Sequence, residues 1–200
     1  MKKEKIFFLF VSIFLLLIVY SFYSKNYAYV LDISTSFVLI TILFVFYKNF
    51  NLNWIVFTLV FLALLLHNFG LFGFYNISPL PFEYDHFVHF FGGLALVMFF
   101  LNIFNNLENL KLNKFFFILF ALFCALGIGS IIEIIEYFGY LFLGKGDGLF
   151  YFGGTGDLGN YQDLTGAWVN SSLDMTYNLI GAVVGIIIYF IIKKIYQKNQ

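Results

Sequence analysis

The chain has 200 residues, of which 62% are hydrophobic, 24% aromatic and only 11% charged, and its formal net charge is zero. Soluble domains carry about 25% charged residues, so this composition excludes a soluble globular protein. The zero net charge argues against a nucleic-acid partner. All basic residues are lysine, because the sequence contains no arginine, and the single cysteine excludes a disulfide framework within the chain.

Six long apolar runs predict an all-α, polytopic integral membrane helical bundle that forms a single domain over residues 1–200. A span requires about 20 mostly apolar residues, and each run is too apolar on every side for an amphipathic soluble helix. The predicted spans are residues 6–23, 30–47, 53–71, 85–104, 114–143 and 171–192. Residues 144–170, rich in glycine and aspartate, are predicted to form an outer lid loop, since loops of this length are often functional.

The distribution of lysines predicts that both termini are cytoplasmic. With the N-terminus inside, the lysines on inner segments are Lys2, Lys3, Lys5, Lys48, Lys111, Lys114, Lys193, Lys194 and Lys198. Only Lys25 and Lys145 fall on outer segments. Because cytoplasmic loops carry the excess of lysine, this distribution places both termini inside. We expect a multi-pass protein of the plasma membrane. The first span ends in bulky residues rather than a small-residue cleavage site, so we expect it to be retained.

The fifth apolar run, residues 114–143, is longer than a bilayer requires. At about 1.5 Å per residue it would make a helix of about 45 Å, which exceeds the hydrocarbon core. It predicts either a helix that tilts and protrudes or one that breaks near Gly127–Gly129.

The fourth span opens with Asp85, His86 and His89. On a helix, Asp85 and His89 share a face at i,i+4, and His86 and His89 share one at i,i+3. Such spacing suits side chains that hold one metal ion. The alternative is that Asp85 caps the helix and the histidines lie at the membrane interface.

The fifth span carries Glu133 and Glu136 at i,i+3, so both carboxyl groups face the same way. A charge near the middle of a bilayer costs about 2.5–3.5 kcal/mol on insertion scales, and adjacent like charges repel. With no arginine in the chain and no lysine inside a span, we expect no intramembrane salt bridge. Proton sharing, a water-filled cavity or a bound cation must compensate, unless the pair only forms hydrogen bonds between helices.

The sixth span opens with Asp174, a further candidate metal ligand, and Asn178 follows deeper on the same face. The alternative for Asp174 is a capping box with Ser171. Gly181 and Gly185 predict a face that packs closely on a neighbouring helix.

Two further ionisable residues, His67 in the third span and Asp32 in the second, are weaker candidates, with an interfacial position as the alternative. Nearly all ionisable residues within the spans therefore map to the outer half of the membrane. Such residues are costly in a bilayer and usually mark function.

These motifs resemble a known family. The segments Tyr84-Asp85-His86-x-x-His89-Phe90, Glu133-x-x-Glu136-Tyr137, Gly-Thr-Gly-Asp157 and Asp174-x-x-x-Asn178-x-x-Gly181-Ala182 resemble the YjdF-like predicted membrane proteins over roughly residues 70–190. They are also distantly similar to the VanZ-like group, some of whose members are associated with glycopeptide-antibiotic tolerance. The resemblance implies a polytopic membrane protein and supports the site list, including Asn178 and Asp157, but implies no particular reaction or metal.

Three functions remain open from the sequence. The first is a metal-assisted hydrolase or transferase that acts on a lipid-linked or envelope substrate from the outer leaflet. Asp85, His89 and Asp174, with His86 as an additional ligand, would hold a divalent metal ion, and Glu133 or Glu136 would act as general acid or base. The second is a proton- or cation-coupled carrier, although the inner half lacks polar groups inside the spans. The third is a non-catalytic accessory membrane protein. In each case the lipid bilayer is the expected partner.

Overall fold

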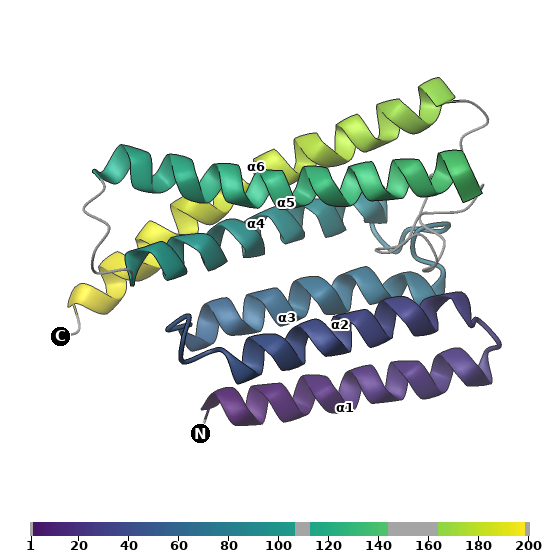
Figure 1. Cartoon of the computed structure of the whole chain (residues 1–200), viewed down its shortest axis with the longest axis horizontal. Coiled ribbons are helices and arrows are strands. Elements are labelled where there is room, and N and C mark those ends of the chain that lie inside the picture. Colours follow the sequence, from purple (N-terminus) through teal and green to yellow (C-terminus); the bar gives the residue numbers. More distant parts are fainter. Residues whose placement is uncertain (1, 107–112, 144–163, 199–200) are drawn as a thin grey trace.

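The structure, a computed structural model, describes residues 2–106, 113–143 and 164–198, and these residues are helical with short connections (Figure 1). The elements are α1 (Lys2–Tyr23), α2 (Ala28–Val45), α3 (Trp54–Asn68), the 3-10 turn η1 (Phe69–Phe72), α4 (Tyr84–Asn105), α5 (Lys114–Leu143) and α6 (Leu164–Lys198). Six of these helices, α3 together with η1 counting as one, are long and apolar enough to cross a membrane. The all-α class and the six-helix architecture are therefore confirmed.

Two features of the last helices resolve alternatives that the sequence leaves open. α5 runs as one helix over 30 residues, without a break at Gly127–Gly129. α6 begins at Leu164 rather than at residue 171. Residues 164–170 contain only one glycine and no proline, so they can continue the helix. Ser171 and Asp174 therefore lie inside α6, and the capping-box interpretation of this pair is wrong. Residues 144–163, which include most of the predicted lid loop and Asp157, lie outside the described residues.

The helices form two layers, α1–α3 and α4–α6 (Figure 1). The main contact between the layers is α3 against α4, and we call this boundary the seam. Both termini lie at one end of the bundle, which we call the termini end. We call the opposite end, at which α4 begins and α5 ends, the site end.

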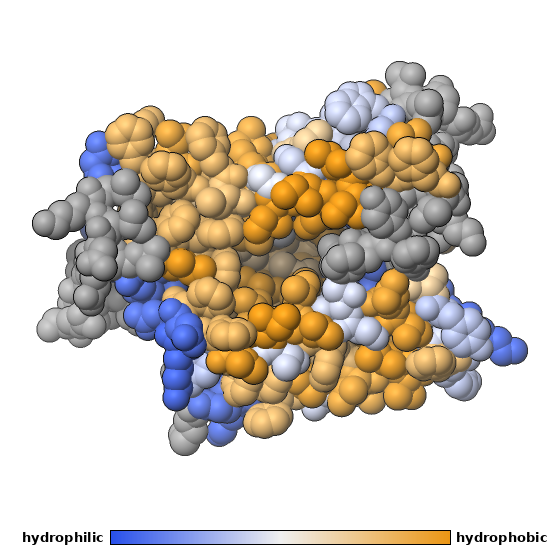
Figure 2. Space-filling model, viewed as in Figure 1, coloured by the Kyte–Doolittle hydropathy of each residue, from blue (hydrophilic) through white to orange (hydrophobic). Residues whose placement is uncertain are grey.

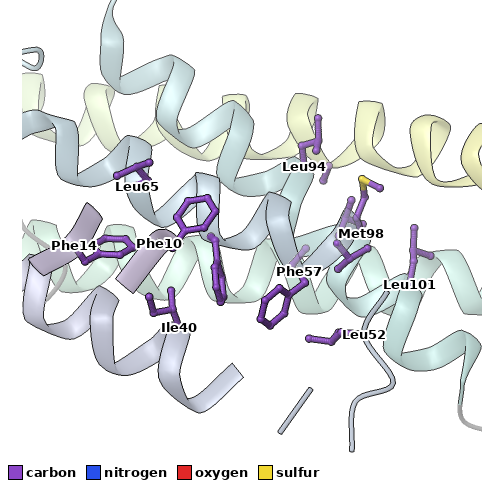
Figure 3. Packing of buried hydrophobic residues seen from close by; sticks show 14 of the residues in the cluster. Phe10, Phe14, Ile40, Leu52, Phe57, Leu65, Leu94, Met98 and Leu101 are labelled. Atoms are coloured by element: carbon purple, nitrogen blue, oxygen red, sulfur yellow. The ribbon is translucent and has the colours of Figure 1, made fainter. Parts of the chain in front are cut away.

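Buried aromatic and aliphatic side chains form a cluster that extends along the bundle, from Leu52 and Leu101 near the termini end to Leu65 toward the site end (Figure 3). The ring of Phe61 packs on Phe57 with centroids 4.3 Å apart and meets the edge of Phe10 at 5.2 Å. Met98 and Leu101 of α4 are fully buried beside them. Because lipid tails are as apolar as these side chains, such close packing rather than the hydrophobic effect holds the helices together.

Glycines bring the backbones of α4 and α6 into direct contact. Gly93 faces the main-chain oxygen of Asn178, and Gly181 faces the main-chain oxygen of Phe90. A Cβ atom at Gly185 would lie 2.9 Å from the Leu94 carbonyl oxygen. Small residues of this kind allow close helix approach in membranes, and the predicted packing face at Gly181 and Gly185 is confirmed. The contact also places α4 and α6 close enough for their polar side chains to meet.

We predict that Gly181→Ala lowers the melting temperature of the detergent-purified protein, because the added methyl group meets a backbone oxygen that cannot rotate away. Overpacking of this kind costs about 1–3 kcal/mol. Gly127→Ala is the matched control, since a Cβ there has nothing within 4 Å. It should leave the melting temperature unchanged or raise it slightly. Equal melting temperatures for the two variants would contradict the close contact between α4 and α6.

Candidate metal centre

The imidazole of His89 lies at the centre of a polar cluster formed by three helices. Its Nε2 atom is 3.4 Å from Oδ1 of Asp85, one turn earlier on α4. Its Nδ1 atom is 3.1 Å from Oε1 of Glu133 on α5 and 3.2 Å from Nδ2 of Asn178 on α6. A protonated Nδ1 can donate to the glutamate, whereas an unprotonated one can accept from the amide or bind a metal. The ring therefore has a polar partner at each nitrogen.

Two sets of side chains are spaced to hold a metal ion, and both include His89. The potential ligand atoms of Asp85, His89 and Asp174 lie within 4.8 Å of one another, as do those of His89, Glu133 and Glu136. Carboxylate oxygens and imidazole nitrogens are common ligands of divalent metals. We call these five residues the acid–histidine cluster.

The charges of the acid–histidine cluster are not balanced by its own side chains. Four carboxyl groups surround one imidazole, and the glutamate at 133 and the aspartate at 174 are only 2% and 1% exposed. The sequence expectation of no intramembrane salt bridge counted only lysine and arginine as cations. Histidine supplies the contacts instead, because His89 pairs with both Asp85 and Glu133. One protonated ring can offset a single negative charge, and His86 lies 3.9 Å from Asp174 as a second histidine. At least two of the four carboxyl groups therefore require protons or a bound cation.

His86, predicted as an additional ligand, lies beside the acid–histidine cluster and belongs to neither metal-spaced set. Its Nε2 atom is 3.3 Å from Oε2 of Glu83 and 3.9 Å from Oδ1 of Asp174. Its ring stacks on that of Tyr177, with centroids 4.2 Å apart. The other oxygen of Asp174 accepts a hydrogen bond of 3.1 Å from Asn170. His86 and Asn170 are thus placed to orient the aspartate.

The predicted candidates on α2 and α3 lie outside the acid–histidine cluster. Tyr75 donates a hydrogen bond of 3.3 Å to the His67 carbonyl oxygen, and its hydroxyl lies 3.1 Å from Nδ1 of the same residue. Burial, together with the nearby carboxyl groups of Asp85 and Glu136, raises the pKa of the Tyr75 hydroxyl well above its ordinary value. The phenol therefore stays protonated and able to donate. Asp32 is buried within α2 and is likewise in neither metal-spaced set.

A cavity of about 360 Å³ adjoins the acid–histidine cluster along the seam. Its polar lining residues are Asp85, His89, Glu136, Asn170 and Asn178, together with His67 and Tyr75. The remaining lining is apolar and comes from α2, α3, α4 and α5. Figure 2 shows the surface recessed between the two layers. Small-molecule sites typically enclose about 300–1,000 Å³, so the space suits a small ligand or part of a larger one.

The structure brings together most of the residues that the sequence singles out, and adds two. Asp85, His89, Glu133, Glu136 and Asp174 converge from three helices, with Asn178 beside them. The added residues are Asn170 and Tyr75. Asn170 lies four residues before Asp174, a spacing that becomes visible once α6 is extended to Leu164. Tyr75 lies in a connecting segment, and no sequence pattern distinguishes it.

Six long apolar helices, three of which carry the polar cluster, are the architecture of a multi-pass membrane protein. The chain belongs to the family described as "Predicted membrane protein (DUF2238)", which it matches over residues 6–195. The match extends beyond residues 70–190 and includes the first two spans. It is consistent with the YjdF-like resemblance and gives no support to the VanZ-like one. No curated protein and no solved structure matches the chain.

We predict that His89→Ala destabilises the metal-free protein, because Asp85 and Glu133 lose the imidazole between them. Adding Glu133→Gln to this variant should restore part of the stability, since a neutral amide needs no cation. Groups in direct contact typically show coupling energies of about 0.5–3 kcal/mol. Thermal unfolding in detergent with a chelator, over a double-mutant cycle, measures this coupling.

The control cycle pairs Glu133→Gln with His86→Ala, because His86 contacts Glu83 and Asp174 rather than Glu133. Its effects should add. Additive effects in the His89 cycle as well would show that the Glu133–His89 contact contributes nothing to stability.

Proposed function

We propose that the acid–histidine cluster binds a divalent metal ion and serves a hydrolase or transferase reaction on a lipid-linked or envelope substrate. The observation that carries this proposal is the position of His89, whose two ring nitrogens each face a carboxyl group. Histidine ligands of metals ordinarily bond a carboxylate or carbonyl through their second nitrogen, which fixes the ring. The arrangement around His89 supplies such a partner whichever nitrogen binds the ion.

The proposed ligands are Asp85, His89 and Asp174, which combine one imidazole with two carboxylates from α4 and α6. Glu133 would then accept a hydrogen bond from Nδ1–H of His89 and hold the ring in place. Glu136 lines the cavity, so it is the acid best placed to exchange a proton with a bound substrate. When bound, a divalent ion supplies a Lewis acid for an ester or phosphoryl oxygen and lowers the pKa of a coordinated water.

Packing at the other end of the bundle favours this proposal over a carrier. Within the described helices, the half nearer the termini end is filled by fully buried Phe57, Phe61, Val97, Met98 and Leu101. A proton or cation pathway would need polar side chains or water in this region. The acid–histidine cluster lies at the site end, and the cavity beside it is apolar where it reaches Leu43 and Phe99. The polar residues Asn53 and Asn102 at the termini end line a different cavity. This separation favours a site that is served from one side of the membrane.

The distribution of lysines supports a site that faces the outer side of the membrane. Lys48, Lys114 and Lys193 lie at the termini end, whereas Lys25 lies at the site end. On the rule that lysine-rich segments stay in the cytoplasm, the site end faces outward from the plasma membrane. The substrate would accordingly come from the outer leaflet or the cell envelope.

We predict that detergent-purified protein, incubated with Zn²⁺ or Mn²⁺ and desalted, retains a near-stoichiometric amount of one metal, measured by mass spectrometry. His89→Ala should lose the metal, and His67→Ala should retain it. His67→Ala is the matched control, because His67 belongs to neither metal-spaced set. Gel filtration verifies that each variant is folded. Wild-type protein that retains no metal, or equal losses in both variants, would overturn the proposed metal site.

A further inference from the structure

We infer that the cavity at the seam holds the hydrocarbon chain of a bilayer lipid, with the lipid's oxygen-bearing head group at the acid–histidine cluster. This inference deepens the proposed function and rests on it for the role of the head group. The position proposed for the hydrocarbon chain rests on the cavity alone.

The cavity exists because the two layers meet mainly along one pair of helices. α3 packs against α4, while α2 and α5 both contribute to the cavity wall without closing on each other. Away from the acid–histidine cluster the wall is apolar, with Leu43, Leu64, Leu96 and Ile132 among its residues. An apolar cavity stays dry rather than filling with water, and an unfilled one forfeits the packing energy of its lining. A hydrocarbon chain would fill it at no polar cost.

The apolar part of the cavity reaches the surface that faces the lipid. Leu39 and Ile42 of α2 and Ile128 of α5 line the cavity and are also 37%, 45% and 37% exposed. Apolar side chains border the recess between the two layers (Figure 2). A chain can therefore enter sideways from the bilayer without passing through water. A water-soluble substrate would not require an opening toward the bilayer.

The polar end of the cavity lies toward the site end of the bundle, as the head group of a lipid in the adjoining leaflet would require. His89 is five residues into α4, about 7.5 Å along the helix from its start, while the apolar lining extends further toward the membrane centre. A lipid in the surrounding leaflet has the same order, with its head near the surface and its chain below. Asn178 supplies an amide donor at the polar end, and a metal ion there would bind an oxygen of the head group.

The test uses a phosphatidylglycerol analogue with a diazirine in its acyl chain, incorporated with the protein into lipid nanodiscs and irradiated. Cross-links are mapped to residues 88–96 of α4, where Val88 and Ala95 line the cavity but are only 9% and 1% exposed. We expect this segment to be labelled in the wild type. Ala63→Trp places an indole in the cavity and should reduce the labelling by about tenfold, as expected for overpacking a bound chain.

Val183→Trp is the matched control, because Val183 is exposed on α6 and does not line the cavity. It should leave the labelling of residues 88–96 unchanged. Val60→Phe narrows the same cavity from α3 and provides a second blocking variant if Ala63→Trp does not fold. Absence of cross-links in residues 88–96 of the wild type, or labelling that persists in a folded blocking variant, would overturn the inference.

Metal content measured on the same preparations separates this inference from the proposed function. A wild type that binds no metal but is labelled in residues 88–96 would refute the metal site and support the chain site. A wild type that binds metal without such labelling would refute the chain site and point to a water-soluble substrate. Ala63→Trp should retain its metal, because Ala63 is not part of the acid–histidine cluster.

Discussion

The arrangement of this protein depends on how buried carboxyl groups are compensated in an apolar bundle that contains no arginine. Asp85, Glu133, Glu136 and Asp174 could not each recruit a long basic side chain, so they converge on the imidazole of His89, with His86 beside Asp174. Convergence of residues from three helices requires those helices to pack closely and in a fixed register. Glycines between α4 and α6 provide this, since Gly93 and Gly181 each lie against a backbone oxygen of the other helix. The electrostatic requirement and the packing of the second layer are therefore two aspects of one constraint.

The same constraint explains why packing within α4–α6 differs from packing across the seam. Within α4–α6 the contacts are close and hold the polar side chains in place, as a site with defined geometry needs. Across the seam the contact is confined mainly to α3 and α4, and the space beside it forms the cavity. A rigid wall that carries the ionisable groups thus faces a second wall, from α2 and α3, that contributes mostly apolar side chains. This division suits a ligand with one polar end and one long apolar part.

The fold could be predicted from the sequence because the length and hydropathy of a span are local properties. The candidate residues could be singled out because any ionisable group in a span is costly. Their partners depend on packing, and here the sequence is insufficient. The spacing of Asp85, His86 and His89 cannot tell which histidine faces α5, and the structure directs His89 to Glu133 but His86 to Glu83 and Tyr177. The cavity is still less predictable from the sequence, because it depends on the two layers being in contact mainly through α3 and α4.

Polar residues at the two ends of the bundle differ in how completely their partners match their hydrogen-bonding and charge requirements. At the termini end, Asn102 accepts a hydrogen bond from the side chain of Asn53 and donates one to the carbonyl of Asn51, so donors and acceptors match. At the site end, four carboxyl groups share one imidazole at their centre. Matched amides need nothing further and stabilise a turn between helices. An excess of acidic oxygens is stable only with added protons or a cation, which is the property that a site for a metal and an oxygen-bearing substrate requires.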